Sequence, residues 1–239
     1  GYKDYEYYKD KCLGFNPDDD SYNITYQTDG NGHISGDAKQ RVKEGSNSTA
    51  VTAIPNTGFH FVSWSDGSTN PTRSENNVLS EITLTASFSV NTYSLNYTAG
   101  SGGSIQGFAS QTANYGSNGA TVTAVPNSGY RFTGWSDGVA TASRTDNNIT
   151  SDISVRANFV ADTYTLNYTA GAHGTISGST SQTVSYGASG AQVTAVPDTD
   201  YHFVRWSDGN TNAARTDTNV NANISVTATF ASDLDITSY

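Results

Sequence analysis

The stretch FHFVSWSDG at residues 59–67 recurs as YRFTGWSDG at residues 130–138 and as YHFVRWSDG at residues 201–209. The copies are 71 residues apart without a gap. A gapless period over most of a chain indicates that one folding unit was copied in tandem. We therefore predict three repeats, at residues 22–91, 92–162 and 163–233. A non-repeating segment, residues 1–21, precedes them as the end of another domain or an exchanged strand, and a tail, residues 234–239, follows.

Apolar and polar residues alternate strictly near the end of each copy, as ITLTASF at 82–88, ISVRANF at 153–159 and ISVTATF at 224–230. A period of two predicts a strand with one buried and one wet face. The opening residues Tyr22, Ile24 and Tyr26 follow the same rule. We count six or seven short strands per repeat and no convincing helix. The expected fold is all-β, with three tandem modules arranged as a linear array.

The tryptophan of each copy breaks this alternation. Phe59 and Phe61 share one face of their strand, and Trp64 falls on the other. A β-bulge near Ser63 would return the indole to the core. We favour this interpretation, because a small module without disulfides needs its largest apolar side chain buried. The alternative is an exposed binding surface on the outer face, formed by Trp64, Trp135 and Trp206 with His60, Arg131 and His202.

A few polar positions are identical in all three copies, among them Asp66, Arg73 and Asn77. Asp66 and Gly67 form a hairpin-type turn signal, and we expect Asp66 and Arg73 to pair across that hairpin. In this structural interpretation the aspartate caps a turn, the arginine covers the tryptophan and Asn77 takes a left-handed conformation. The alternative is a ligand site present three times.

The charge and the polar residues argue against several functions. The net charge is −10 and no Lys/Arg patch is evident, so we expect no nucleic-acid partner. No apolar run approaches the ~20 residues of a transmembrane helix, so we expect no membrane insertion. No paired carboxylates, nucleophile elbow or metal-ligand spacing recurs in the copies. We therefore expect neither enzymatic activity nor a cofactor.

Two features lie before the repeats. Asp18, Asp19 and Asp20 are weak Ca²⁺-ligand candidates, because Ca²⁺ takes several oxygen ligands. A charged, solvated linker is the favoured interpretation, because the later junctions carry one Asp between them. Cys12 is the only cysteine, so an intermolecular disulfide is the pairing open to it.

The repeat resembles the divergent form of the internalin-B-type B-repeat, the Listeria–Bacteroides repeat group. The matching pieces are Tyr93-x-Leu95-x-Tyr97, Gly-x-Ile-x-Gly, residues 122–126, residues 129–138 and the final Ile-x-Val-x-Ala-x-Phe. The resemblance implies a secreted or cell-surface prokaryotic protein, often an adhesin. It also implies β-grasp-like modules with a short helix, although this sequence shows no clear helix. The family has no known catalytic residues to transfer.

We expect an extracellular stalk or spacer that extends or presents something. Its partners would be neighbouring repeats or other copies of itself, with a host or environmental glycan or protein as a further candidate. Two alternatives stay open from the sequence. One is a fibre subunit that polymerises through its terminal segments, and the other is a carbohydrate-binding module that uses the repeated tryptophans.

Overall fold

The computed structural model describes residues 20–233, in which every regular element is a β-strand. Cys12, Asp18, Asp19 and the terminal segments proposed for polymerisation lie outside these residues, except for Asp20 and Ser21 at the end of the N-terminal segment. The short helix that the family resemblance implies does not occur within residues 20–233. Nor does that range contain any helix with the length and apolarity required to cross a bilayer.

Seven strands recur in each 71-residue repeat. In repeat 1 they are β1 (Ser21–Thr28), β2 (Gly32–Ser35), β3 (Lys39–Lys43), β4 (Val51–Pro55), β5 (Phe59–Trp64), β6 (Thr72–Arg73) and β7 (Ile82–Val90). In repeat 2 they are β8 (Thr92–Ala99), β9 (Gly103–Gln106), β10 (Ser110–Asn114), β11 (Val122–Pro126), β12 (Tyr130–Trp135), β13 (Ser143–Arg144) and β14 (Ile153–Ala161). In repeat 3 they are β15 (Thr163–Ala170), β16 (Gly174–Ser177), β17 (Ser181–Ser185), β18 (Val193–Pro197), β19 (Tyr201–Trp206), β20 (Ala214–Arg215) and β21 (Ile224–Ser232).

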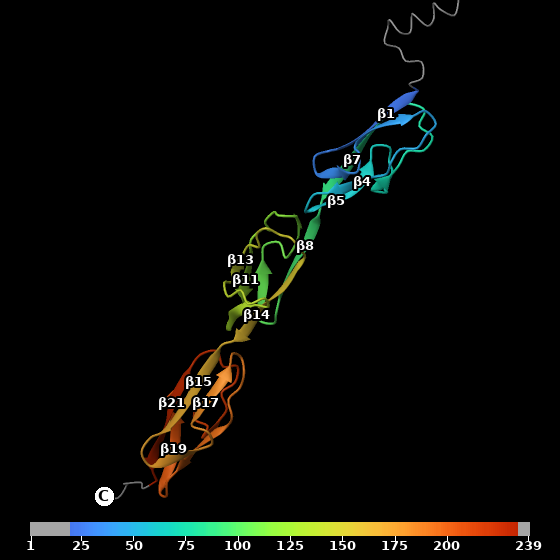
Figure 1. The fold of residues 1–239 in the computed structure, drawn as a ribbon. Helices are drawn as coiled ribbons and strands as arrows, with labels where there is room; N and C mark the ends of the chain where they lie inside the picture. Colours follow the sequence, from blue (N-terminus) through green and yellow to red (C-terminus); the bar gives the residue numbers. More distant parts are fainter. Residues whose placement is uncertain (1–19, 234–239) are drawn as a thin grey trace, which may run out of the picture. The chain divides into compact units, whose positions relative to one another are not determined.

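The strands of a repeat form two sheets. Repeat 1 has a four-stranded sheet of order β3-β1-β7-β5 and a three-stranded sheet of order β2-β4-β6, and the same orders recur in the other repeats. β1 and β7 are parallel neighbours, from the pair Ile24–Ile82 to the pair Thr28–Ala86 (Figure 1). The other pairings in repeat 1 are antiparallel. Sequence alternation explains the faces but does not by itself identify these partners.

The chain divides into two compact units of residues that contact one another, and the boundary between the units runs through repeat 2. Of the described residues, the first unit contains those up to Leu95, together with Gln111–Gly119 and Asp146–Ile153. The second contains Asn96–Ser110, Ala120–Thr145 and the described residues from Ser154 onward. Repeat 1 therefore lies wholly in the first unit and repeat 3 wholly in the second.

The core of repeat 1 draws on both of its sheets. β1 buries Ile24 and Tyr26, β7 buries Leu84, Ala86 and Phe88, and β4 buries Val51 and Ala53. In each strand the buried residues are two apart, because successive side chains point to opposite faces. Repeat 3 builds the same core at equivalent positions, with Leu166, Tyr168, Val193, Ala195, Trp206, Val226, Ala228 and Phe230.

A β-bulge places the tryptophan in this core. Phe61 pairs with Phe88 and Ser63 pairs with Ser87, so Val62 is the extra residue and is 46% exposed. The bulge changes the parity of the strand, and Trp64 consequently joins the face of Phe61 at a ring-centroid distance of 5.9 Å. Equivalent shifts lie between Phe132 and Gly134 and between Phe203 and Arg205. The predicted bulge near Ser63 is confirmed.

The predicted hairpin at Asp66–Gly67 is wrong, although the turn itself forms. The Gly67 N–H donates to Trp64 O at 2.8 Å, and Gly67 has a φ of 90°. β6, however, pairs with β4 and not with β5. The physical reason lies in the loop that follows the turn, where the Pro71 carbonyl accepts a hydrogen bond from Ala53 N–H of β4 at 2.9 Å. This bond joins the loop to β4, so the next strand, β6, pairs with β4 in the three-stranded sheet.

Candidate functional site

The three tryptophans are buried, with exposed fractions of 1% for Trp64, 3% for Trp135 and 0% for Trp206. The Trp64 Nε1–H donates to Asn70 O at 3.0 Å, so the polar edge of the indole is also satisfied. The ring of Tyr26 contacts Trp64 edge-on at 5.7 Å. A sugar-stacking platform needs an exposed aromatic face. The hypothesis of a carbohydrate-binding module that uses these tryptophans is therefore wrong.

An arginine closes the remaining side of each indole. The Arg73 guanidinium lies over Trp64, 5.2 Å from the ring centroid. Its Nη1 and Nη2 donate to the two carboxylate oxygens of Asp66 at 3.1 and 2.8 Å. Its Nε donates to Glu75 Oε1 at 2.6 Å. The planar fork of arginine suits this bidentate geometry. The predicted Asp66–Arg73 pair and the cover over the tryptophan are confirmed.

The same cluster recurs in the other two repeats. In repeat 2, Arg144 lies 5.1 Å from the Trp135 ring and pairs with Asp137 at 2.9 Å. In repeat 3, Arg215 lies 5.1 Å from the Trp206 ring. It pairs with Asp208 at 3.0 Å and Asp217 at 2.6 Å. Arg144 and Arg215 are buried.

The pKa shifts in the cluster keep its aspartate ionised and its tyrosine neutral at neutral pH. The hydrogen bond from Arg73 lowers the pKa of Asp66 to about 2. Burial raises the pKa of the Tyr26 hydroxyl. In repeat 3, burial and the hydrogen bond to Asp217 raise the pKa of Tyr168. An ionised aspartate and a protonated tyrosine at neutral pH are poorly matched to proton transfer, which requires a pKa near the operating pH.

One member of the cluster was not identified from the sequence. The acid at position 75 is Glu75 in repeat 1, whereas the equivalent residues are Asp146 and Asp217. Tyr26 Oη approaches both Ser48 Oγ, at 3.3 Å, and Glu75, at 3.4 Å. A comparison by residue class, with Asp and Glu treated as equal, would have found this position. Only the arginine of the cluster lies over the tryptophan; its partners Asp66 and Glu75, 42% and 17% exposed, hold it there, so the geometry of the cluster serves packing.

The remaining predicted site residues lie elsewhere. Asn77 has a φ of 50°, as predicted for a left-handed asparagine. Asp20 is exposed, and residues 20–233 contain no group of three or more His, Cys, Asp or Glu side chains placed to hold a metal ion.

The variable residues of the bulged strand are exposed and pair with the residue that ends each repeat. His60 Nδ1 lies 2.8 Å from Asn91 Oδ1. Arg131 Nη1 donates to Asp162 Oδ1 at 3.2 Å. His202 Nδ1 lies 2.6 Å from Asp233 Oδ1. These pairs are separate from the arginine–tryptophan cluster, so the structure does not combine the two sets into one site.

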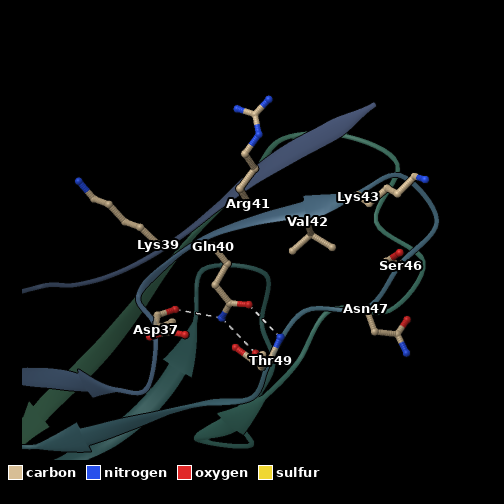
Figure 2. Close-up of a pocket in the computed structure, with 9 residues that line it drawn as sticks. All are labelled: Asp37, Lys39, Gln40, Arg41, Val42, Lys43, Ser46, Asn47 and Thr49. Atoms are coloured by element: carbon tan, nitrogen blue, oxygen red, sulfur yellow. Dashed lines mark hydrogen bonds between the residues drawn. The ribbon is translucent and has the colours of Figure 1, made fainter. Parts of the chain in front are cut away.

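An open hollow of about 400 Å³ adjoins β3 in repeat 1. Figure 2 shows Gln40 pointing into it, where its amide nitrogen donates to the carbonyls of Asp37 at 2.9 Å and Thr49 at 3.1 Å. Lys39 and Arg41 point away from Gln40 on the opposite side of the strand (Figure 2).

Lys39, Arg41 and Lys43 are exposed and two residues apart, so they form a cationic row on one face of β3. Sequence analysis found no basic patch, because Gln40 and Val42 separate these residues along the chain. The equivalent residues are Ser110, Thr112 and Asn114 in repeat 2 and Ser181, Thr183 and Ser185 in repeat 3.

Comparisons with known proteins give a family and a similar solved structure. The family model described as "Divergent InlB B-repeat domain" matches residues 22–92, 93–163 and 164–234. Among solved structures, the chain is similar to "The Bacillus anthracis TIE protein", with a TM-score of 0.41 and 9% sequence identity. That alignment covers 87% of this chain and 49% of the other, so the chain spans about half the length of that protein. No curated protein matches the sequence.

Proposed function

Because the chain belongs to the divergent InlB B-repeat family, we propose that it is the stalk or spacer region of a secreted or cell-surface prokaryotic protein, of the adhesin type. The carrying observation is the position of the arginine that all three repeats share. Arg73 and its partners close over a buried tryptophan. A copied ligand site would leave the shared arginine available to a ligand, whereas here its two acidic partners hold it over the indole.

We also propose that this region is neither an enzyme nor a cofactor-binding protein. The support is that the charged groups common to all three repeats are engaged in ion pairs and hydrogen bonds within the fold. The residues that differ between copies, such as His60 and Arg131, are on the exposed face. Repeated copies of such a scaffold add length without adding a reactive centre.

Surface exposure is the testable core of this proposal. Antibodies raised against residues 22–233 should label intact cells of the producing organism without permeabilisation. A short treatment of intact cells with protease should remove the signal. Labelling that appears only after permeabilisation would contradict the proposal.

The spacer role has a separate test, because removal of residues 93–163 keeps the 71-residue period in phase. We expect the shortened chain to fold and to remain surface-labelled, since a spacer tolerates a change in copy number. A chain that requires all three copies to fold or reach the surface would contradict a simple spacer.

The cationic row on β3 favours a second candidate role, attachment to an anionic surface glycan. Its three positive charges are concentrated in a chain of net charge −10. Binding of a sulfated polysaccharide should weaken from 50 to 200 mM salt, because exposed charges are screened. It should be lost when Lys39, Arg41 and Lys43 are all replaced by glutamine. Equal binding by this triple variant would rule out the row as the site.

A further inference from the structure

A tyrosine ring lies directly on a glycine where repeat 1 meets repeat 2. The residues involved, Gly58, Asn91 and Tyr115, all belong to the first compact unit. A Cβ atom at Gly58 would lie 2.2 Å from Tyr115 Cδ1, so only glycine admits the ring in this position. Asn91, the one residue between β7 and β8, donates its N–H to Gly58 O at 2.8 Å and accepts from Tyr115 N–H at 2.8 Å.

The same arrangement recurs where repeat 2 meets repeat 3, within the second unit. A Cβ atom at Gly129 would lie 2.2 Å from Tyr186 Cδ2. Asp162, between β14 and β15, donates its N–H to Gly129 O and accepts from Tyr186 N–H, each at 2.8 Å. The Tyr130 ring contacts the Tyr186 ring edge-on, with centroids 6.3 Å apart.

The equivalent positions at the two outer ends keep the backbone bonds but lack the ring and the glycine. At the start of repeat 1, Glu44 N–H donates to Asp20 O, and the residue equivalent to Tyr115 is this glutamate. At the end of repeat 3, Asp233 N–H donates to Asp200 O at 2.9 Å. The residue equivalent to Gly58 is Asp200, which is exposed and has a φ of 64°. Tyrosine and glycine thus occur as pairs where two repeats meet.

We propose that the tyrosine–glycine pair is the docking interface between consecutive repeats and couples the stability of one repeat to the next. At each junction the earlier repeat contributes the glycine, Gly58 or Gly129. The following repeat contributes the tyrosine ring that packs on it, Tyr115 or Tyr186. The partner is therefore another copy of the repeat that carries tyrosine at the position of Tyr115. Repeat 1 carries Glu44 at the position of this tyrosine, and repeat 3 carries Asp200 at the position of this glycine.

The physical basis is close approach together with exclusion of water. The ring lies against Gly58, whose carbonyl accepts the hydrogen bond from Asn91 N–H, so we expect it to slow hydrogen exchange at that amide. Glycine also tolerates the φ of 83° found at Gly58. Any side chain at Gly58 displaces the ring, so loss of either partner should expose the same hydrogen bond.

The test uses the full chain and residues that the repeats already contain. Tyr115→Glu introduces the residue of repeat 1, and Gly58→Asp introduces the residue of repeat 3, so both are compatible with the local fold. In each variant we expect amide hydrogen exchange at Asn91 to accelerate about tenfold. Exchange at Tyr168, whose N–H bonds to Thr180 O at 2.9 Å in repeat 3 and away from this junction, should accelerate less.

A double-mutant cycle separates the contact from backbone strain. Gly58→Ala is compared with Gly67→Ala, because Gly67 has a similar φ of 90° and nothing within 4 Å of an added Cβ. Gly58→Ala should lower the urea midpoint more than Gly67→Ala does, and Tyr115→Glu should abolish the difference. Unchanged exchange at Asn91 in both variants, or additive effects of Gly58→Ala and Tyr115→Glu, would overturn the proposal.

The biological use of this interface rests on the proposed spacer role, whereas the interface itself does not. The exchange and urea measurements are made on purified protein, so their failure would leave surface localisation unaffected. Conversely, a protein found only inside cells would leave the measured coupling intact.

Discussion

Replacement of Arg215 by methionine should destabilise repeat 3 by about 3 kcal/mol. The Arg215 side chain is 5% exposed, and that of its partner Asp217 is 14% exposed. Removal of one partner of a fully buried pair costs about 3–5 kcal/mol, because the other charge is left uncompensated. The Tyr168 hydroxyl still donates to Asp217 at 2.6 Å, which places the estimate at the lower end. The pair with Asp208, which is 42% exposed, adds about 1 kcal/mol or less.

Methionine keeps much of the contact with Trp206, so the loss is chiefly electrostatic. It includes the cation–π contact at 5.1 Å, for which about 0.5–2 kcal/mol is typical. Urea unfolding of the full chain, followed by tryptophan fluorescence, should show one transition shifted by about 1–3 M, since m values are about 1–3 kcal/mol/M.

Two further variants test the cause. Arg205→Met alters an exposed arginine of the same repeat, and we expect it to change stability by no more than ~0.5 kcal/mol. Asp217→Asn, added to Arg215→Met, should recover part of the loss by removing the unpaired charge. A loss below about 1 kcal/mol for Arg215→Met, or no recovery with Asp217→Asn, would refute a buried and mutually dependent pair.

Three other outcomes are expected. Gly174→Ala places a Cβ 2.4 Å from Phe230 Cζ and should cost about 1–3 kcal/mol by overpacking, measured by thermal unfolding. In a Phe230→Leu background, which lacks Cζ, the cost of Gly174→Ala should fall, and an equal cost in both backgrounds would contradict the steric argument. Because the pKa of Asp66 is depressed to about 2 from 3.8, its stabilisation is present above pH ~4 and lost as the pH falls through 2. Asp66 is 42% exposed, so this effect should stay below about 1 kcal/mol; an unchanged pH profile of Tm in Asp66→Asn would contradict it. Finally, the native protein should show tryptophan emission at short wavelength and weak acrylamide quenching, whereas strong quenching would contradict the burial of Trp64 and its equivalents.

Much of the fold could be predicted from local patterns in the sequence. The alternation in residues 82–88 predicts β7 and its buried face correctly, because pleating makes side-chain direction a local property. The parity of Trp64 predicts the bulge, because a large indole in a small module has to be buried. Identity across copies at Asp66 and Arg73 predicts their pairing, which the structure shows at 2.8 Å.

Non-local features were harder to predict. The partner of β6 depends on a hydrogen bond between Pro71 and Ala53, which no turn motif at Asp66–Gly67 encodes. Glu75 was not predicted as a member of the cluster, because a search for identical residues in the three copies passes over a position that holds Glu in one copy and Asp in the others. The cationic row on β3 became visible only once its residues were assigned to a strand.

The parallel pairing of β1 with β7 sets how a repeat responds to tension. The chain enters repeat 1 through β1 and leaves through β7, and five residue pairs join these strands side by side. β15 and β21 are joined in the same way in repeat 3. A pull on the two ends of a repeat drives such strands lengthwise past each other, so the whole ladder is loaded in shear and its bonds break together. Under force the rate of unfolding, and not equilibrium stability, governs survival. Resistance to stretching is therefore a property of strand order, and it persists however the exposed residues diverge.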